Sequence, residues 1–151
     1  TANVKINPTT IITEQPTPAR QTKGKDSTVM PILRTAAGTA PITYQWYSTV
    51  TNVRTGGIPI SGATNASYTP LSTVTGTLYY YVFVTGPCGK DSSNTATVIV
   101  NPSTTITAGP TPASQTVCKD SAAAISITAT CTAPLSYQWF SNTTNPSTGG
   151  T

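Results

Sequence analysis

The chain has 151 residues, a net charge of +4, no histidine and only four carboxylates. This composition leaves little for acid–base catalysis, excludes zinc sites of cysteine and histidine, and disfavours calcium sites, so we expect no enzyme and no cofactor. Basic residues cluster only at Arg20, Lys23 and Lys25, which we interpret as turn charges, and no apolar run approaches the roughly 20 residues of a membrane helix. We therefore expect neither nucleic-acid binding nor membrane insertion.

The sequence repeats itself with a period of about 93 residues. A Tyr-Gln-Trp segment around Trp46 returns around Trp139, and residues 1–8 match residues 95–102. A fixed period of this length is typical of a tandem array. The predicted divisions are the last strand of a preceding repeat (1–8), a complete repeat (9–101) and the first half of a following repeat (102–151).

Short segments typical of β-strands follow one another along the repeat. Aromatic and β-branched residues dominate the apolar fraction and alternate with polar ones, which favours strands over disorder. The first predicted strand covers residues 10–13 and ends at the proline-rich segment 15–18. The second is clearest in the later repeat, at 124–129. In the earlier repeat Pro31 interrupts the matching stretch, where we expect a β-bulge.

The third predicted strand carries a core tryptophan, because Ile42, Tyr44 and Trp46 fall on one face. After a Gly-Gly turn come the segments 58–60 and 66–69, and then residues 78–84, which are all aromatic or aliphatic. Such a run indicates a central strand with both faces covered, although it does not tell which of its three tyrosines face inward. A turn at 88–91 precedes the alternating last strand at 95–100.

Seven or eight strands with a tryptophan on the third predict an all-β fold, built from tandem immunoglobulin-like β-sandwich repeats of about 93 residues. Trp46 and Trp139 are the expected core centres of their repeats. An antibody-type domain joins its second and penultimate strands by a disulfide, but neither strand has a cysteine at its centre here. The tryptophan must therefore pack against aliphatic and tyrosine side chains.

Several segments together resemble the immunoglobulin-like repeats of giant Bacteroidota surface adhesins, above all the gliding-motility adhesin of the type IX secretion pathway. The resemblance covers essentially the whole chain and rests on QTVCKD (115–120), PLSYQW (134–139), GATNASYTP (62–70) and LYYYV (78–82). It implies an extracellular, cell-surface filament that takes part in adhesion. The expected partners are neighbouring repeats of the same chain and surface polysaccharides or glycans.

The cysteines form an odd set whose redox state is open, either free thiols or disulfides. On an immunoglobulin template Cys88 and Cys131 lie at one pole and Cys118 at the other. In a tandem array the Cys118 position then faces the Cys88 position of the next repeat. We expect an inter-repeat disulfide between such positions, and no disulfide among Cys88, Cys118 and Cys131 themselves.

Two serines are candidate modification sites. Asp26-Ser27-Thr28 returns as Asp120-Ser121-Ala122, and both resemble the O-glycosylation acceptor pattern of Bacteroidota. The alternative interpretation is a turn aspartate before a strand. The sequence thus makes Ser27 and Ser121 possible O-glycosylation sites of a glycoprotein.

The function that the sequence favours is a structural and adhesive repeat in a stiff stalk. Pro8 and Pro102 follow asparagines at the expected joints, where proline fixes φ and restricts the preceding residue. Two alternatives stay open: a carbohydrate-binding module that uses exposed tyrosines such as Tyr47, and a subunit that exchanges strands in a polymeric filament.

Overall fold

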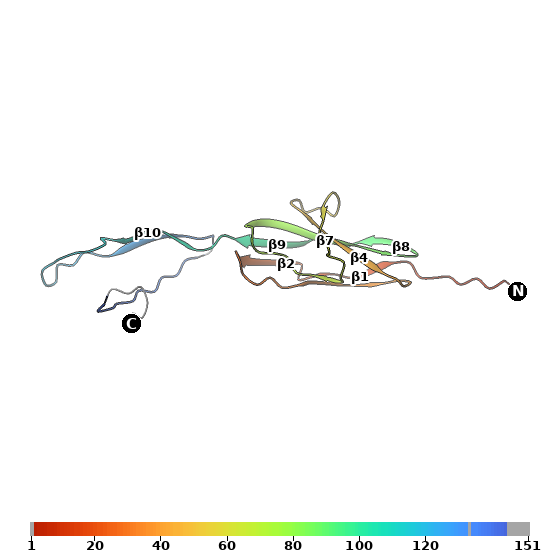
Figure 1. Ribbon diagram of the computed structural model, residues 1–151, viewed down its shortest axis with the longest axis horizontal. Coiled ribbons are helices and arrows are strands. Elements are labelled where there is room, and N and C mark those ends of the chain that lie inside the picture. Colours follow the sequence, from red (N-terminus) through yellow and green to blue (C-terminus); the bar gives the residue numbers. More distant parts are fainter. Residues whose placement is uncertain (1, 133, 145–151) are drawn as a thin grey trace. The chain divides into compact units, whose positions relative to one another are not determined.

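The computed structural model describes residues 2–132 and 134–144. The chain divides into two compact units, Thr1–Pro102 and Ser103–Thr151. Each is described by itself below, and the strand labels are those of Figure 1.

The first unit is built from two β-sheets. One sheet has the order β1-β3-β6, and the other has the order β2-β9-β7-β4-β5, with β8 paired to β7 (Figure 1). The strands are β1 (Ile11–Thr17), β2 (Arg20–Gly24), β3 (Ile32–Ala37), β4 (Thr43–Thr49), β5 (Ile58–Pro59), β6 (Ser67–Tyr68), β7 (Gly76–Gly86), β8 (Gly89–Ser92) and β9 (Ala96–Asn101). One sheet pairs β1 with β3, and the other places the long β7 beside the last strand β9, which is the arrangement of an immunoglobulin-like sandwich. The predicted fold class is therefore confirmed.

The core lies between the two sheets. Trp46 is 0 % exposed, and its indole nitrogen Nε1 donates to the Asn65 carbonyl oxygen at 2.9 Å. The inward-facing residues of the central strand and of the last strand pack with it: Tyr80, Val82, Val84, Ala96, Val98 and Val100. β7 lies in the middle of its sheet, as predicted, and Tyr80 is the tyrosine of that strand that joins the core cluster.

The N-terminal part of the first unit differs from its prediction. β1 continues to Thr17, and its pairing with β3 shifts register twice, between Ile12 and Glu14 and between Glu14 and Thr17. The irregularities in the pairing therefore lie along β1. Pro31, where we expected a β-bulge, lies just before β3. β2 was missed: it pairs parallel to β9, so Arg20 and Lys23 are strand residues and not turn charges.

One further expectation in this unit is wrong. The turn after β7 consists of Pro87 and Cys88, and the strand resumes at Gly89, so residues 88–91 are not all turn. Residues 2–8 are exposed and form no strand in this structure. Their assignment as the last strand of a preceding repeat stays a prediction.

The second unit repeats the first hairpin of the fold. β10 (Thr105–Thr111) pairs antiparallel to β11 (Ser126–Thr130), with two register shifts at the positions that match those of β1. No other strand occurs in the described residues of this unit. Trp139 is 51 % exposed, so the expectation of a core residue is wrong here, because no second sheet covers it in the described structure.

Candidate functional site at the two ends of the repeat

The end where the chain enters the first unit is closed by Thr10, which is only 4 % exposed. Its side chain fills a notch lined by two glycines. A Cβ at Gly86 would lie 2.5 Å from Thr10 Oγ1, and one at Gly38 would lie 3.0 Å from Thr10 Cα. Both glycines are therefore needed for the close approach of the entering chain.

A hydrogen bond fixes the chain just before this notch. Thr39 Oγ1 donates to the Pro8 carbonyl oxygen at 3.2 Å, and Cys88 Sγ lies 4.0 Å from Thr39 Oγ1. Thr39 belongs to the loop between β3 and β4, and Cys88 to the turn between β7 and β8. The loop between β3 and β4 therefore holds the chain at Pro8, and the turn that carries Cys88 contacts that loop.

The opposite end holds the chain where it leaves the unit. The last residue of β9, Asn101, pairs with Gly24 at the end of β2, and the Lys25 N–H donates to the Asn101 carbonyl oxygen at 2.8 Å. The turn that supplies Lys25 is itself fixed, because the Asp26 N–H donates to the Ser72 carbonyl oxygen at 2.9 Å. Ser72 Oγ donates to the Ser27 carbonyl oxygen at 2.6 Å.

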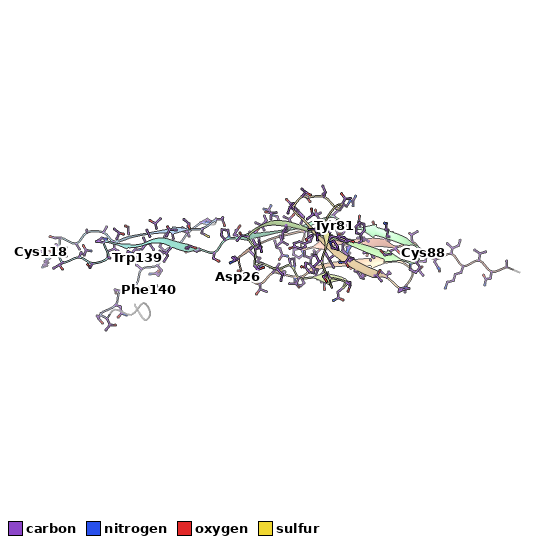
Figure 2. All side chains as sticks on the ribbon, turned by 45° about the horizontal axis from the view of Figure 1, so that its top comes forward. Asp26, Tyr81, Cys88, Cys118, Trp139 and Phe140 are labelled. Atoms are coloured by element: carbon purple, nitrogen blue, oxygen red, sulfur yellow. The ribbon has the colours of Figure 1, made fainter. Side chains whose placement is uncertain are left out.

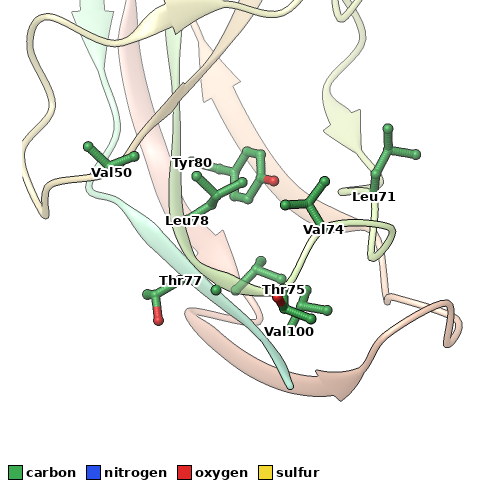
Figure 3. A pocket seen from close by; sticks show the side chains of 10 residues that line it. Val50, Leu71, Val74, Thr75, Thr77, Leu78, Tyr80 and Val100 are labelled. Atoms are coloured by element: carbon green, nitrogen blue, oxygen red, sulfur yellow. The ribbon is translucent and has the colours of Figure 1, made fainter. Parts of the chain in front are cut away.

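An apolar hollow of about 190 Å³ lies near this exit end (Figure 3). Leu71 and Val74, from the loop before β7, stand at its rim and are 70 % and 72 % exposed. Tyr80 lines it from β7. Burial, followed by the influence of Tyr68, raises the pKa of Tyr80 to about 12. The hydroxyl of Tyr80 is therefore neutral well above physiological pH.

The two predicted modification sites lie in matching turns. Ser27 and Ser121 are exposed, and each N–H donates at 3.2 Å to the carbonyl oxygen three residues earlier. Asp26 and Asp120 precede them with positive φ values of 61° and 63°. Aspartate tolerates this conformation better than most residues. Glycosylation of either serine stays a prediction.

The predicted cysteine positions are distributed over opposite ends. Cys88 lies at the entry end of the first unit, and Asp26, in the turn that starts at Gly24, lies at its exit end (Figure 2). Gly24 is the sequence counterpart of Cys118, which is exposed in the second unit. Neither Cys88 nor Cys118 is in a disulfide within the described residues, and Cys131 is half-buried.

The outer face of the larger sheet carries an aromatic cluster of Tyr47, Tyr81 and Phe83. The rings of Tyr47 and Tyr81 are stacked at 5.3 Å, and Phe83 meets Tyr47 edge-on at 5.4 Å. The Gly57 N–H donates to the Tyr81 hydroxyl at 3.0 Å, and Tyr81 is only 1 % exposed. Tyr47 is half-buried, and Tyr81 covers one face of its ring, so it is less exposed than the carbohydrate-binding alternative expected.

Sequence reasoning missed a polar group that is buried between the sheets. Arg34 is 5 % exposed, and its Nε and Nη1 have no hydrogen-bond partner among the described residues. Burial lowers the pKa of the Arg34 guanidinium, against the opposing influences of Tyr44 and Asp91. The alternation of β3 places residue 34 inward, but nothing in the pattern indicates that a charge would be tolerated there.

The described residues also offer little for other kinds of site. They contain no group of three histidine, cysteine, aspartate or glutamate side chains that could hold a metal ion. Within the same residues, the chain has no helix of the length and apolar character needed to cross a membrane.

Comparison with known proteins gives one family and a solved structure. A structure of three immunoglobulin domains of titin, in a Glu-to-Ala variant, is similar with a TM-score of 0.47 and 21 % identity. The match covers 70 % of this chain and 37 % of the titin chain. No curated protein matches the sequence. The model of a domain of unknown function, DUF8696, matches residues 8–102, and the chain therefore belongs to the DUF8696 family.

Proposed function

We propose that this repeat is a building block of a stiff stalk, in which successive units are joined without a free linker. One observation carries the proposal: the structure holds Pro8 at the entry end and Asn101 at the exit end of one unit. The pair Asn7-Pro8 recurs as Asn101-Pro102. In an array, the last residue held by one repeat and the first residue held by the next are therefore consecutive.

The absence of slack has a mechanical consequence. A flexible linker lets two domains reorient, whereas a joint of one peptide bond before a proline leaves few dihedral angles free. Each unit brings its own core, so the array gains length without relying on long-range contacts. A spacer of this kind holds a terminal segment away from the surface that carries it.

The resemblance to Bacteroidota adhesin repeats extends this proposal to the cell surface. We infer an extracellular filament that contributes to attachment or gliding and is exported by the type IX pathway. Its partners are neighbouring repeats and, at the adhesive segments, surface glycans. The exposed Ser27 and Ser121 turns would accept O-linked sugars, which support the same location.

The stiffness of the joint can be measured by small-angle X-ray scattering. Three copies of residues 8–101 joined head to tail recreate the Asn-Pro bond at each joint. The maximum dimension should grow linearly with the number of copies. The matched control carries Gly-Ser-Gly-Ser at each joint and should scatter as a bent, averaged chain. Equal flexibility in both arrays would remove the proposal.

A second candidate function is strand exchange between copies. Residues 2–8 repeat the inward-facing pattern of β9, and Val4 and Ile6 are 81 % and 89 % exposed. Such a segment can complete a sandwich that lacks its last strand, either in the same chain or in another copy. Sedimentation of the 151-residue chain over a range of concentrations tests this. Oligomers that disappear on Val4→Asp, Ile6→Asp substitution favour exchange, and a monomer at all concentrations excludes it.

A further inference from the structure

We infer that the paired parallel strands β2 and β9 resist mechanical force when the two ends of the unit are pulled apart. They pair in continuous register from Arg20 with Thr97 to Gly24 with Asn101. β2 lies early in the first unit and β9 is its last strand, so this pairing fastens the entering part of the unit directly to the leaving part (Figure 1).

The direction of load follows from where the chain enters and leaves. β7 spans the unit, since Gly76 pairs with Val100 at one end and Gly86 with Gly89 at the other. Its 11 residues correspond to about 35 Å at roughly 3.3 Å per residue. The chain enters at the Gly86 end, where Thr10 fills the notch, and leaves at the Asn101 end.

Pulling the two ends apart therefore loads β2 and β9 in shear. Force from the N-terminal side acts on the Arg20 end of β2, and force from the C-terminal side acts on the Asn101 end of β9. Because the strands are parallel, these forces oppose each other along the strand axis. All hydrogen bonds of the pair then carry load together, whereas peeling would break them one at a time.

Two side-chain bonds extend this connection toward the entry end. The Ile12 N–H donates to Asp91 Oδ2 at 2.9 Å, and the Asn94 N–H donates to Gln15 Oε1 at 2.9 Å. Both join β1 to the segment that contains β8 and the loop after it, across 79 residues of sequence. The N-terminal and C-terminal segments of the unit are thus joined along most of their length.

This inference rests on the proposed stalk function only for the origin of the load. A unit that resists force but sits on a flexible joint would fail the scattering test and pass the one below. A stiff array of mechanically weak units would do the reverse.

Single-molecule force spectroscopy of the full 151-residue chain, held at its two ends, tests the inference with two proline variants. The Thr97 N–H donates to the Ala19 carbonyl oxygen and the Lys25 N–H to Asn101, so odd-numbered residues of β2 face β9. The Lys23 N–H therefore belongs to the ladder, and the Thr22 N–H points to the free edge of the sheet. Lys23→Pro removes one hydrogen bond between β2 and β9, and Thr22→Pro is the matched control.

The parent chain should give a distinct rupture peak for the first unit. Lys23→Pro should raise the rupture rate at a given force about five- to tenfold, the equivalent of one hydrogen bond, while Thr22→Pro stays within about twofold of the parent. Gln15→Ala removes the bond to the Asn94 N–H without altering the β2–β9 ladder, and it should raise the rupture rate by a smaller factor. This variant serves as the test if Lys23→Pro does not fold. Extension of the parent without a peak, equal effects of the two prolines, or no effect of Gln15→Ala would each overturn the inference.

Discussion

Residues 9–101 and residues 102–144 carry matching sequence signals, but among the described residues only the first region forms a core. The local features recur in both. β1–β3 and β10–β11 share their register shifts, and the turns at Asp26 and Asp120 share their positive φ. The tryptophans differ completely: Trp46 is 0 % exposed and Trp139 is 51 % exposed.

Each region contains a glutamine clamp, which is a pair of hydrogen bonds between one glutamine side chain and the backbone of a residue eight or nine positions later. Gln21 Nε2 donates to the Met30 carbonyl oxygen at 3.0 Å, and the Met30 N–H donates to Gln21 Oε1 at 3.0 Å. Gln115 makes the same two bonds to Ala123, at 3.0 and 2.9 Å. Hydrogen bonds between residues eight or nine positions apart in the sequence therefore form without a second sheet. Burial of an aromatic ring needs a second sheet.

The largest effect should come from the tryptophans. Trp46→Ala should lower the free energy of unfolding of the first unit by about 3–5 kcal/mol, because a buried indole is replaced by a cavity. Trp139→Ala should leave that value within about 0.5 kcal/mol, since its ring is half exposed. Chemical denaturation of the 151-residue chain measures both. Equal losses would mean that Trp139 is buried in solution.

The second-largest effect should be a loss of stability of the first region at high pH. The pKa of Tyr80 is raised by burial from 10.0 to about 12. The stability contributed by the neutral hydroxyl is therefore fully present below pH 10 and is lost as pH rises from 10 toward 12. The loss should approach about 3 kcal/mol. Thermal melting between pH 8 and 12 measures it. Tyr80→Phe should flatten the profile, and an unchanged profile in that variant would assign the loss to other groups.

Much of this fold could be predicted from the sequence, because alternation reports burial directly. The last strand shows this: Ala96, Val98 and Val100 were expected on one face, and all three are buried. β2 was missed because RQTKG has no apolar alternation and resembles a turn. Its structure comes from pairing with β9, about 77 residues later in sequence, which no local pattern reports.

The candidate site was harder to predict than the fold. The joint prolines and the poles of Cys88 and of the Cys118 position could be inferred from the repeat and an immunoglobulin template. The notch around Thr10 could not, because Gly38 and Gly86 lie far from it in sequence and glycines in loops are usually interpreted as turn residues. Close approach between distant segments leaves no periodic signal.

The glutamine clamps should differ in cost although their bonds are alike. Gln21→Ala should lower the free energy of unfolding by about 1–2 kcal/mol, because Gln21 is only 7 % exposed and Met30 loses both partners. Gln115→Ala should cost little, because water reaches the exposed groups of Ala123. Amide hydrogen exchange reports each site: Met30 should lose protection in the first variant. Strong protection of Ala123 in the parent would contradict the comparison.

The smallest change in free energy should come from exchanging the residues that the two regions place at one register position. Arg34 and Ile127 are equivalent, since Glu14 pairs with Thr35 and Ala108 with Thr128. Arg34→Ile should leave the free energy of unfolding unchanged or raise it by about 1 kcal/mol, because an incompletely paired buried charge is replaced by an apolar side chain that the fold uses elsewhere. Arg34→Ala is the control and should lower it by about 2 kcal/mol through the cavity it leaves. Denaturant titration separates these outcomes. A loss above about 2 kcal/mol in Arg34→Ile would show that the favourable interactions of Arg34 with Tyr44 and Asp91 outweigh the cost of burying the guanidinium.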